Sequence, residues 1–496
     1  MSQTLETAAN PRDLRRVVIE PVTRVEGHGK VTILLDEENH IHQVRLHIVE
    51  FRGFEKFIQG RPYWEVPVMV QRLCGICPVS HHLAAAKAVD MLVGARQLTP
   101  TAEKLRRLLH VGQMLQSHAL HFFYLASPDL LFGFDSDVEQ RNIIGVIAAH
   151  PDLALKGVKL RKYGQEVIRH ITGKRVHGTA AVPGGMNKAL TAEERDSMRR
   201  DIGQMVAWSK VAVDLSRKVF ETSEHSPRFA NFPSNYLSLI GQDGELDFYD
   251  GGLRARDAEG AAIFDQVDYA HYNRYIREEV KSWSYMKFPY IIGLGSEDGW
   301  YRVGPLARLN NCDRITTPLA EAERQSFRAA AGGGLQHATL AYHWARMIEM
   351  LHSAEEIERL LEDPDICGTD LVTRGERALE GVGLVEAPRG TLFHHYKINE
   401  NDVVEKANLI VSTTSNNQAM NEAVRQVAIR YLDGKKLTEG LLNHIEVAIR
   451  AYDPCLSCAT HALGKMPLQV ELRDAEGQLV DRLVKGADGS VDGGTA

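Results

Sequence analysis

Two Cys-x-x-Cys pairs at opposite ends of the chain limit what this sequence can fold into more than any other feature. The first pair is Cys74 and Cys77, the second is Cys455 and Cys458, and Cys455 lies 378 positions after Cys77. The two-residue gap lets both thiolates of a pair face one point, and four thiolates suit a metal such as zinc, iron or nickel. If one site uses both pairs, the two ends of the chain must meet. We therefore expect one intertwined unit.

Three kinds of site are compatible with these pairs. A structural zinc site is the ordinary interpretation of two isolated pairs, but zinc ribbons usually close shorter loops. A thioredoxin-like dithiol needs a buried strand just ahead of the pair, and the segment RPYWEVPVMVQRL is not typical of one. The third is a catalytic metal centre assembled from both ends of the chain. The other two cysteines, Cys312 and Cys367, form no cluster motif and are typical of buried apolar residues.

Composition argues against several classes of protein. The 496 residues are 25% charged with a formal net charge of −7, so nothing predicts a nucleic-acid or anionic-membrane surface. No apolar run approaches the roughly 20 residues that span a bilayer, and the N-terminus lacks the apolar stretch of a secretory signal. Six cysteines are too few for a disulfide scaffold in so long a chain. We expect a cytoplasmic protein without a membrane span.

Hydrophobic periodicity predicts an α+β fold that is mainly helical. Residues 16–49 alternate in KVTILL and HIHQVRLHIV around the turn DEENH, which indicates antiparallel strands. Helical periodicity follows the Thr99-Pro100 cap and recurs from about Leu340 onward. We expect long apolar faces to form a central bundle of helices, with peripheral antiparallel β segments near the N-terminus and in the middle of the chain.

We expect one intertwined domain over residues 1–461 and an extension over residues 462–496, a boundary implied by the family resemblance of the motifs that follow. The extension contains two alternating runs in LQVELRDAEGQLVDRLV, which predict a hairpin. Within the domain we expect an N-terminal β region (16–60), a helical region (61–230), a β-rich excursion (231–300) and a helical region that returns to the metal site (301–461).

Five motifs resemble the successive signatures of the large subunit of nickel–iron hydrogenases. They are PVTRVEGHGK (21–30), EFRGFEKF (50–57), QRLCGICPVSHH (71–82), VEAPRGTLFHHY (385–396) and AYDPCLSCATH (451–461). They occur in the family's order, and EFRGFEKF and DPCLSCATHALG are most similar to the soluble, NAD-reducing branch. The resemblance implies a catalytic subunit that reversibly splits dihydrogen heterolytically, with electrons passing through partner subunits to NAD.

The resemblance also implies the metal ligands. Cys74, Cys77, Cys455 and Cys458 would bind nickel, and Cys77 and Cys458 would bridge to iron. The iron would carry carbon monoxide and cyanide, which no protein residue supplies. Thiolates are soft donors that tolerate changes in the oxidation state of nickel, so the chemistry agrees with this assignment.

Three residues match the family's reactive groups. Glu26, in TRVEGHG, and the terminal thiolate of Cys455 are the family-like bases for the proton of dihydrogen. Arg389, in EAPRG, matches an arginine over the metals, where a guanidinium would polarise dihydrogen or stabilise negative charge. Without the motifs, Glu26 would be a solvated loop carboxylate and Arg389 a surface arginine after a proline turn.

Other matched residues would surround these groups. His81 would donate a hydrogen bond to a cysteine sulfur. Asp453 and Asp129 would fix Arg389, although Asp129 rests on the looser match HFFYLASPD and could equally cap a helix. In many relatives a tryptophan and an arginine stand where this chain has Ser415 and Met420, so one outer partner of the arginine is missing or replaced.

Two more sets of residues follow from the resemblance. Val411 and Thr413, in LIVSTTSNN, would contact a cyanide ligand, or could lie in a plain buried strand. Glu55, the backbone carbonyl of Leu409 and His461 would form a magnesium site. Carboxylate, carbonyl and water are the ligands that magnesium prefers, and the histidine is the unusual member.

Partners are implied because the chain cannot carry electrons away by itself. No Gly-x-Gly-x-x-Gly motif follows a strand, so we expect NAD to bind elsewhere. The resemblance implies a small subunit with an iron–sulfur cluster and, for the NAD-reducing branch, diaphorase subunits with FMN and NAD. It also implies nickel-insertion factors and a maturation protease that removes residues 462–496 after His461.

Three alternatives stay open at this point. A large subunit of the same family could use another acceptor, deazaflavin-linked or viologen-like. The related quinone-site subunit of respiratory complex I lacks the four cysteines, so their presence argues against it. A structural zinc protein, with four cysteine ligands and a role in binding other molecules, belongs to a different class. Metal analysis would distinguish it from a hydrogenase.

Overall fold

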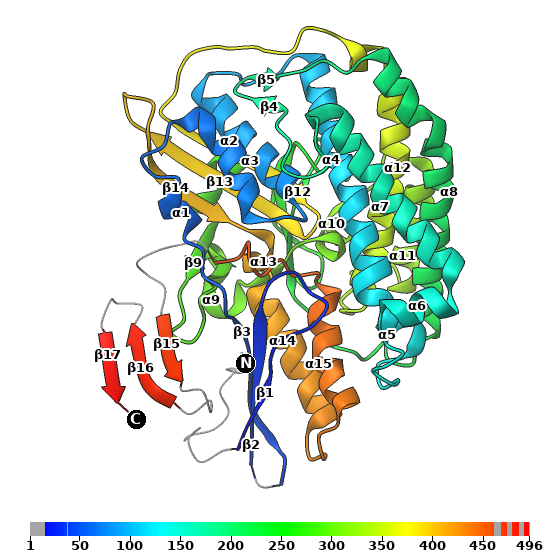
Figure 1. Cartoon of the computed structure of the whole chain (residues 1–496), viewed down its shortest axis with the longest axis vertical. Coiled ribbons are helices and arrows are strands. Elements are labelled where there is room, and N and C mark those ends of the chain that lie inside the picture. The colour runs from blue at the N-terminus through cyan, green and yellow to red at the C-terminus, as the bar shows by residue number, and fades with distance from the viewer. Residues whose placement is uncertain (1–14, 37, 461–467, 474–478, 486–490, 496) are drawn as a thin grey trace.

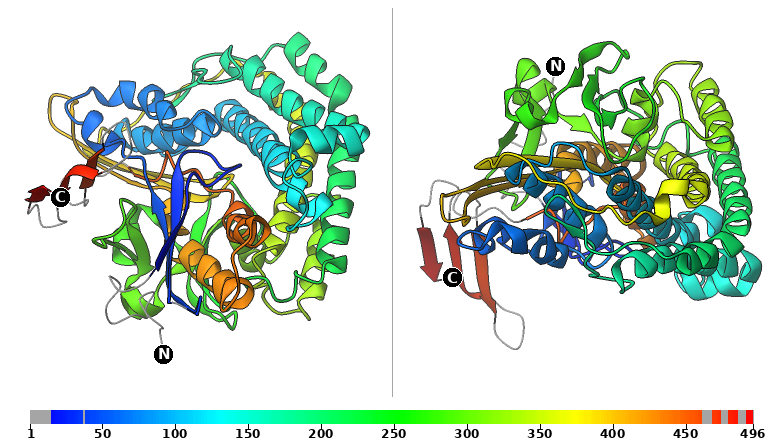
Figure 2. Two further views of the ribbon diagram at one scale, coloured as in Figure 1. Left: turned by 60° about the horizontal axis from the view of Figure 1, so that its bottom comes forward. Right: turned by 90° about the horizontal axis from the view of Figure 1, so that it is seen from above.

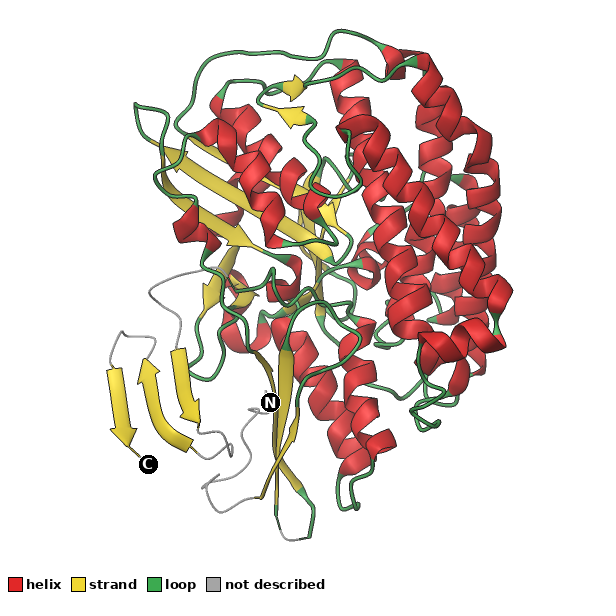
Figure 3. Ribbon diagram, in the orientation of Figure 1, coloured by secondary structure: helices red, strands yellow, loops and turns green. Residues whose placement is uncertain are grey.

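Long helices form one side of the molecule, and small sheets occupy the other (Figures 1 and 3). Helix α4 (Pro100–Leu120) packs against α7 (Pro151–Thr172) and α12 (Ala341–Glu362), and α12 also packs against α8 (Ala192–Thr222). The expectation of a mainly helical α+β fold with a bundle of long helices is confirmed. This computed structural model describes residues 15–36, 38–460, 468–473, 479–485 and 491–495.

The predicted helix caps explain where two of these helices begin. Thr99 is the N-cap of α4, its side chain accepts a hydrogen bond from the backbone N–H of Ala102 (3.2 Å), and Pro100 occupies the first turn. Thr191 begins α8 with a capping box, in which its hydroxyl and the Glu194 side chain each accept from the other's backbone N–H. Apolar periodicity and local caps therefore define the bundle together.

Shorter helical segments connect the long helices to the sheets. Helix α3 (Pro78–Leu92) follows the first cysteine pair, and α15 (Glu439–Ala451) leads into the second. Among the described residues, no helix is long and apolar enough to cross a membrane. The other α-helices are α1 (Phe54–Phe57), α2 (Val66–Met69), α5 (Ser127–Phe132), α6 (Ile143–Ala149), α9 (Gly295–Asp298), α10 (Pro305–Asn311), α11 (Pro318–Ala330), α13 (Ser412–Ser415) and α14 (Asn417–Val427).

The expected β regions near the N-terminus and in the middle of the chain are both present. Strands β1 (Arg15–Ile19), β2 (Gly29–Leu35) and β3 (Ile41–Ile48) form an antiparallel sheet in chain order. In the second sheet the order is β11-β6-β7-β8, and only β11 pairs in parallel. The strands between residues 181 and 302 are β4 (Ala181–Val182), β5 (Gly185–Met186), β6 (Asn235–Ile240), β7 (Gly252–Arg256), β8 (Ala262–Val267), β9 (Ile276–Glu279), β10 (Phe288–Ile291) and β11 (Tyr301–Arg302).

A third sheet corrects the prediction that residues 301–461 are helical. Strands β12 (Glu380–Ala387), β13 (Gly390–Ile398) and β14 (Val404–Ile410) pair antiparallel, and β12 packs against α3. Every residue of β12 after Glu380 is buried. A strand covered on both faces lacks the apolar–polar alternation that indicates a half-exposed strand, so the periodicity did not indicate it.

The C-terminal segment forms a sheet of its own beside the rest of the chain (Figures 1 and 2). The expected hairpin consists of β15 (Leu468–Arg473) and β16 (Leu479–Lys485), and β17 (Val491–Thr495) adds a third antiparallel strand. His461 lies outside the described residues.

Buried neutral histidines predict that acid destabilises this fold. Burial disfavours the imidazolium and lowers the pKa of His82, His110 and His118 to about 4 in each case. Between about pH 6.5 and pH 4, the unfolded chain therefore binds protons that the folded chain does not. The free energy of unfolding should fall with falling pH in this window, by about 1.4 kcal/mol per pH unit for each histidine.

Thermal unfolding of the assembled enzyme at about pH 7, 6 and 5 measures this dependence. The exposed His271 is a matched control, and His271→Gln should leave the slope unchanged. A melting temperature that is flat across the window would show that these histidines are not held neutral.

Candidate metal centre

The fold brings both cysteine pairs to one point. The sulfurs of Cys74, Cys77, Cys455 and Cys458 all lie within 4.8 Å of one another, and all four residues are buried. The Cys455 sulfur lies 3.4 Å from that of Cys74 and 2.6 Å from that of Cys458. Both distances exceed the roughly 2.05 Å of a disulfide. The site is therefore a cluster of free thiols that can hold a metal.

The first pair is positioned by the start of α3. Cys77 is the N-cap of this helix, and the backbone N–H groups of Ile76 and Cys77 donate to the Cys74 sulfur (3.2 and 3.3 Å). From α4, Gln113 and Gln116 donate to the Ile76 carbonyl (2.8 and 2.7 Å). A sulfur beside a helix N-terminus is stabilised as the thiolate by the helix dipole and the exposed amides.

The second pair lies in the loop after α15 and is held from two sides. Thr413 accepts a hydrogen bond from the backbone N–H of Cys455 (2.9 Å). The backbone N–H of Arg52 donates to the Thr460 carbonyl (2.9 Å), and its guanidinium donates to the Leu73 carbonyl (3.2 Å). Arg52 thus joins the loops of both cysteine pairs.

Glu26 lies against the same loop. Its backbone carbonyl accepts from Leu456 N–H (3.0 Å), and its carboxylate accepts from the N–H (3.2 Å) and the hydroxyl of Ser457. At Gly27 the backbone has φ +84°, and an added Cβ would lie 2.7 Å from the Ser457 nitrogen. The close approach of the two segments therefore requires glycine at this position.

Arg389 occupies the two-residue turn between β12 and β13, facing the cysteines. Its guanidinium donates to the Asp453 carbonyl (2.6 Å) and carboxylate (3.1 Å). Burial disfavours the charge of Arg389, but Asp453 and the cysteine thiols outweigh it and keep the pKa well above its usual value. Its Nη1 has no hydrogen-bond partner among the described residues. A fixed cation with a spare donor therefore faces the sulfurs.

A small cavity beside the sulfurs has a wall whose chemistry suits an iron with small ligands. It is lined by apolar Pro388, Leu392 and Val411 as well as by Arg389 and Thr413. The Thr413 hydroxyl oxygen accepts from Cys455, so its hydrogen is available as a donor toward the cavity. Soft sulfurs on one side and hydrogen-bond donors in an apolar wall on the other suit diatomic ligands that accept hydrogen bonds.

Other expected residues are placed as follows. His81 hydrogen-bonds His394 through Nδ1 (3.1 Å). Hydrogen bonds from the three other thiols, and from His81, hold the pKa of Cys77 well below its usual value. Val411 precedes α13, directly after β14, rather than lying inside a strand.

Asp129 requires a correction. Its carboxylate accepts from Arg24 (2.6 Å), Arg450 (3.0 Å) and Asn443 (3.1 Å), whereas Arg389 is held by Asp453. The looser motif match pointed to the right segment but not to the right partner. Arg24 follows the N-terminal strand and Arg450 lies on α15, so no local pattern relates them to Asp129.

Glu55 and Leu409, two of the residues expected at the magnesium site, are in contact through the backbone N–H of Leu409 and not through its carbonyl. The Glu55 carboxylate accepts from the backbone N–H of Leu409 (2.9 Å), which places it beside that residue's peptide. Burial raises the pKa of Glu55 against the opposing effect of Lys287. The third expected ligand, His461, is not among the described residues.

A buried ion network behind the Arg389 turn was not expected from the sequence. Arg308, on α10, donates two bonds to Glu349 (both 2.6 Å) and one to Glu386 (2.7 Å), and all three side chains are fully buried. Arg308 also donates to the carbonyls of Ala387 (2.9 Å) and Pro388 (3.3 Å), just before Arg389. The network therefore fixes the turn, and its members lie too far apart in sequence to form a motif.

Two family models match this chain. One, described as HoxL-like, covers residues 16–51, and one described as nickel-dependent hydrogenase covers residues 52–132 and 239–461. The chain belongs to the nickel-dependent hydrogenase family. The intervening residues 133–238, which contain α6, α7 and α8, lie outside both matches.

Curated relatives of this hydrogenase span nearly its whole length. The NAD-reducing hydrogenase HoxS subunit beta of Cupriavidus necator is 50% identical over 483 residues, 94% of this chain and 99% of the relative. An F420-non-reducing hydrogenase subunit of Methanothermobacter thermautotrophicus is 43% identical over 94% of this chain and 100% of its own.

Solved structures agree with the assignment to the hydrogenase family. A crystal structure of an NAD+-reducing nickel–iron hydrogenase in the H2-reduced state has a TM-score of 0.88 and 58% identity, covering 90% of this chain and 99% of its own. The nickel–iron–selenium hydrogenase of D. vulgaris Hildenborough has a TM-score of 0.74 at 23% identity, over 90% of this chain and 100% of its own, and shows the shared fold alone.

Removing the cation of the buried network should destabilise this hydrogenase strongly. Arg308→Met leaves Glu349 and Glu386 buried without their guanidinium, and we expect it to lower the free energy of unfolding by about 3–5 kcal/mol. Arg314→Met is a matched control, because Arg314 is half-exposed and lies 3.4 Å from Asp243. It should change stability by less than about 0.5 kcal/mol. Equal effects in denaturant unfolding would contradict this account of the network.

Proposed function

We propose that this hydrogenase chain is the catalytic subunit of a complex that reversibly splits dihydrogen and passes the electrons to NAD through partner subunits. The observation that carries the chemistry is the cluster of four buried sulfurs within 4.8 Å of one another, faced by Arg389. The similarity to two proteins named as NAD-reducing hydrogenases supports NAD as the acceptor.

The four cysteines are proposed to hold nickel, with Cys77 and Cys458 bridging to an iron that carries carbon monoxide and cyanide. The donor chemistry of the cavity wall supports this assignment, because Arg389 and Thr413 offer hydrogen bonds beside apolar side chains. When bound, the centre supplies the electrophile at which dihydrogen is polarised and the acceptor for its two electrons.

Residues of this chain accept the proton and stabilise the negative charge that the reaction develops. Splitting one dihydrogen releases two protons and two electrons, so a base is needed beside the metals. We assign this role to the Cys455 thiolate and to Glu26, whose carboxylate contacts Ser457 in the same cysteine loop. Arg389 stabilises negative charge in a place from which water is excluded, where a fixed cation has most effect. Asp453 holds Arg389 in position.

Three supporting roles are part of the proposal. His81 supports the Cys77 thiolate by a hydrogen bond. Val411 and Thr413 line the cavity and would contact a cyanide ligand of the iron. Glu55, the Leu409 carbonyl and His461 bind magnesium, and the contact of the Glu55 carboxylate with the Leu409 peptide supports this site.

The proposed partners are a small subunit with an iron–sulfur cluster and diaphorase subunits with FMN and NAD, in the cytoplasm. We also propose that nickel-insertion factors load the site and that a protease removes residues 462–496 after His461. The separate sheet of β15, β16 and β17 supports treating this segment as a removable unit.

A second candidate is the same reaction with another acceptor. It is favoured by the identity of 43% to a methanogen protein named as an F420-non-reducing hydrogenase subunit. The two candidates share the metal site and differ in the partners that carry electrons away, so they differ in the acceptor that is reduced.

The ligand assignment is tested by replacing one bridging thiolate. Cys458→Ser exchanges a soft donor for a hard one, and we expect the purified complex to lose most of its nickel and iron. Cys367→Ser is a matched control because Cys367 is a half-buried free cysteine outside the cluster, and it should keep its metals. A Cys458→Ser protein with normal metal content and turnover would refute the assignment.

The acceptor is tested with the complex purified anaerobically with its native partners. Hydrogen-dependent reduction of NAD together with viologen is the expected result. Reduction of viologen alone would favour the second candidate. Failure to reduce either, by a nickel-loaded chain, would contradict the catalytic role.

A further inference from the structure

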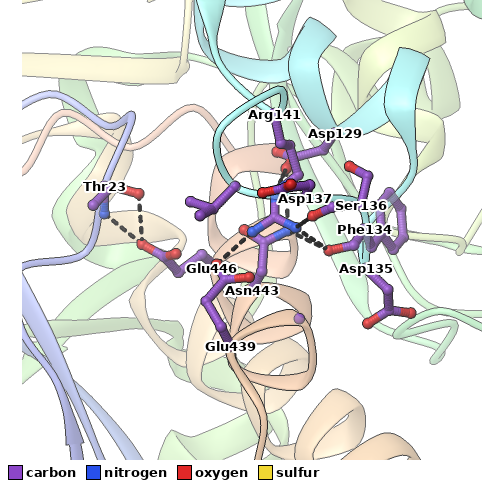
Figure 4. Close-up of polar contacts among 12 residues, drawn as sticks. Thr23, Asp129, Phe134, Asp135, Ser136, Asp137, Arg141, Glu439, Asn443 and Glu446 are labelled. Carbon is purple, nitrogen blue, oxygen red and sulfur yellow. Dashed lines mark hydrogen bonds and ion pairs between the residues drawn. The ribbon is translucent and has the colours of Figure 1, made fainter.

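A cluster of buried polar side chains holds the loop that carries Glu26. The loop spans residues 20–28, has no helix or strand of its own, and lies between β1 and β2. Figure 4 shows Thr23 of this loop bonded to Glu446 of α15, with Asp129, Arg141 and Asn443 close by. We call the contacts of Thr23 and Arg24 with Glu446, Arg450 and Asp129 the Thr23 clamp.

All polar groups of Thr23 are used by the clamp. Its backbone N–H and hydroxyl donate to the Glu446 carboxylate (2.5 and 3.0 Å). Arg450 donates to its carbonyl (3.0 Å) and to its hydroxyl oxygen (2.9 Å). Glu446 and Arg450 also pair with each other (3.0 Å) along α15. The position of Thr23 relative to α15 is therefore determined at both ends of its peptide.

The clamp also maintains a strained residue. Arg24 has φ 55°, a left-handed conformation that non-glycine residues seldom adopt and that persists only when the surroundings enforce it. Its guanidinium donates to the Leu125 carbonyl (2.8 Å) and to Asp129 (2.6 Å). Asp129 is buried, and Arg450 donates to its second oxygen (3.0 Å). The Asp129 carboxylate thus links Arg24 of the loop to Arg450 of α15.

The same helix leads to the metal centre. Shortly after Arg450, the chain leaves the end of α15 and reaches Cys455. On the other side of the clamp, Glu26 follows Arg24 closely and contacts Leu456 and Ser457. The clamp therefore fixes the loop of the carboxylate and the helix of the terminal cysteine against each other. Arg24 and Arg450 do not release protons, so their part in the clamp is geometric.

We propose that Thr23, Arg24, Asp129, Glu446 and Arg450 are positioning residues that set the placement of Glu26 relative to Cys455. The inference rests on the proposed role of Glu26 as the proton acceptor. A displacement of about 1 Å at a reacting group is enough to lower a rate by up to about 100-fold. Loosening the clamp should therefore slow proton transfer while leaving the cysteine cluster intact.

The test uses two substitutions at Thr23, each made in the assembled complex. Thr23→Val keeps the shape of the side chain but removes the hydroxyl that joins Glu446 and Arg450, whereas Thr23→Ser keeps the hydroxyl. Hydrogen-dependent viologen reduction is measured in H2O and in D2O, together with nickel content. Viologen avoids any dependence on the acceptor subunits.

We expect Thr23→Val to lower turnover about tenfold and to increase the solvent isotope effect, with unchanged nickel. Thr23→Ser should restore both toward the values of the unmodified enzyme. Added to Glu26→Gln, Thr23→Val should cause no further loss, because the group that the clamp positions is already absent. Asp90→Asn breaks a buried pair with Arg106 well down α3, and should leave the isotope effect unchanged.

Each other outcome overturns the proposal. If Thr23→Val matches Thr23→Ser in turnover and isotope effect, the clamp does not position Glu26. If turnover falls only in proportion to nickel, the clamp supports the metal site and not the proton step. If Glu26→Gln itself retains full turnover, the proposed role of Glu26 fails, a result distinct from failure of the clamp alone.

Discussion

Four sulfurs buried within 4.8 Å of one another place the strongest constraint on this molecule. Like charges so close together in a medium of low dielectric cannot all be present without compensating cations. The thiols differ in pKa. Hydrogen bonds from the other thiols lower the pKa of Cys77, whereas burial raises the pKa of Cys455. Among the described residues, Arg389 is a fixed cation that faces the sulfurs. Four thiolates together therefore require metal ions, which agrees with the family to which the chain belongs.

The rest of the fold keeps two distant parts of the chain in contact. Arg52 bonds to both cysteine loops, and Glu26 bonds to the peptide that follows Cys455. Behind these contacts, Arg308 fixes the Arg389 turn, and the Thr23 clamp fixes the Glu26 loop. The Arg308 network and the Thr23 clamp both contain buried ion pairs. Removing one member of such a pair leaves its partner as a buried, unpaired charge, which is costly. Placement of the reactive groups therefore depends on networks outside the cavity itself.

The sequence predicted features that depend on local chemistry or on dense motifs. The cap at Thr99, the apolar face of α4 and the two cysteine pairs are visible in short windows, and the structure places them as expected. Strand β12 was not predicted because a strand buried on both faces has no alternating pattern. Asp129 was matched to its segment but assigned to Arg389 in place of Arg24 and Arg450. The contacts of Asp129 with Arg24 and Arg450 span more than 100 positions and belong to no motif that pairs them, so the sequence did not indicate them.

The central claim is that the two ends of the chain close on one sulfur site for nickel and iron. X-ray absorption at the nickel edge, combined with metal analysis of the anaerobically purified complex, tests it most directly. The account predicts nickel and iron bound to the chain, with protein ligands to nickel that are sulfur alone. Zinc in place of both metals, or a nickel shell dominated by nitrogen and oxygen, would contradict it.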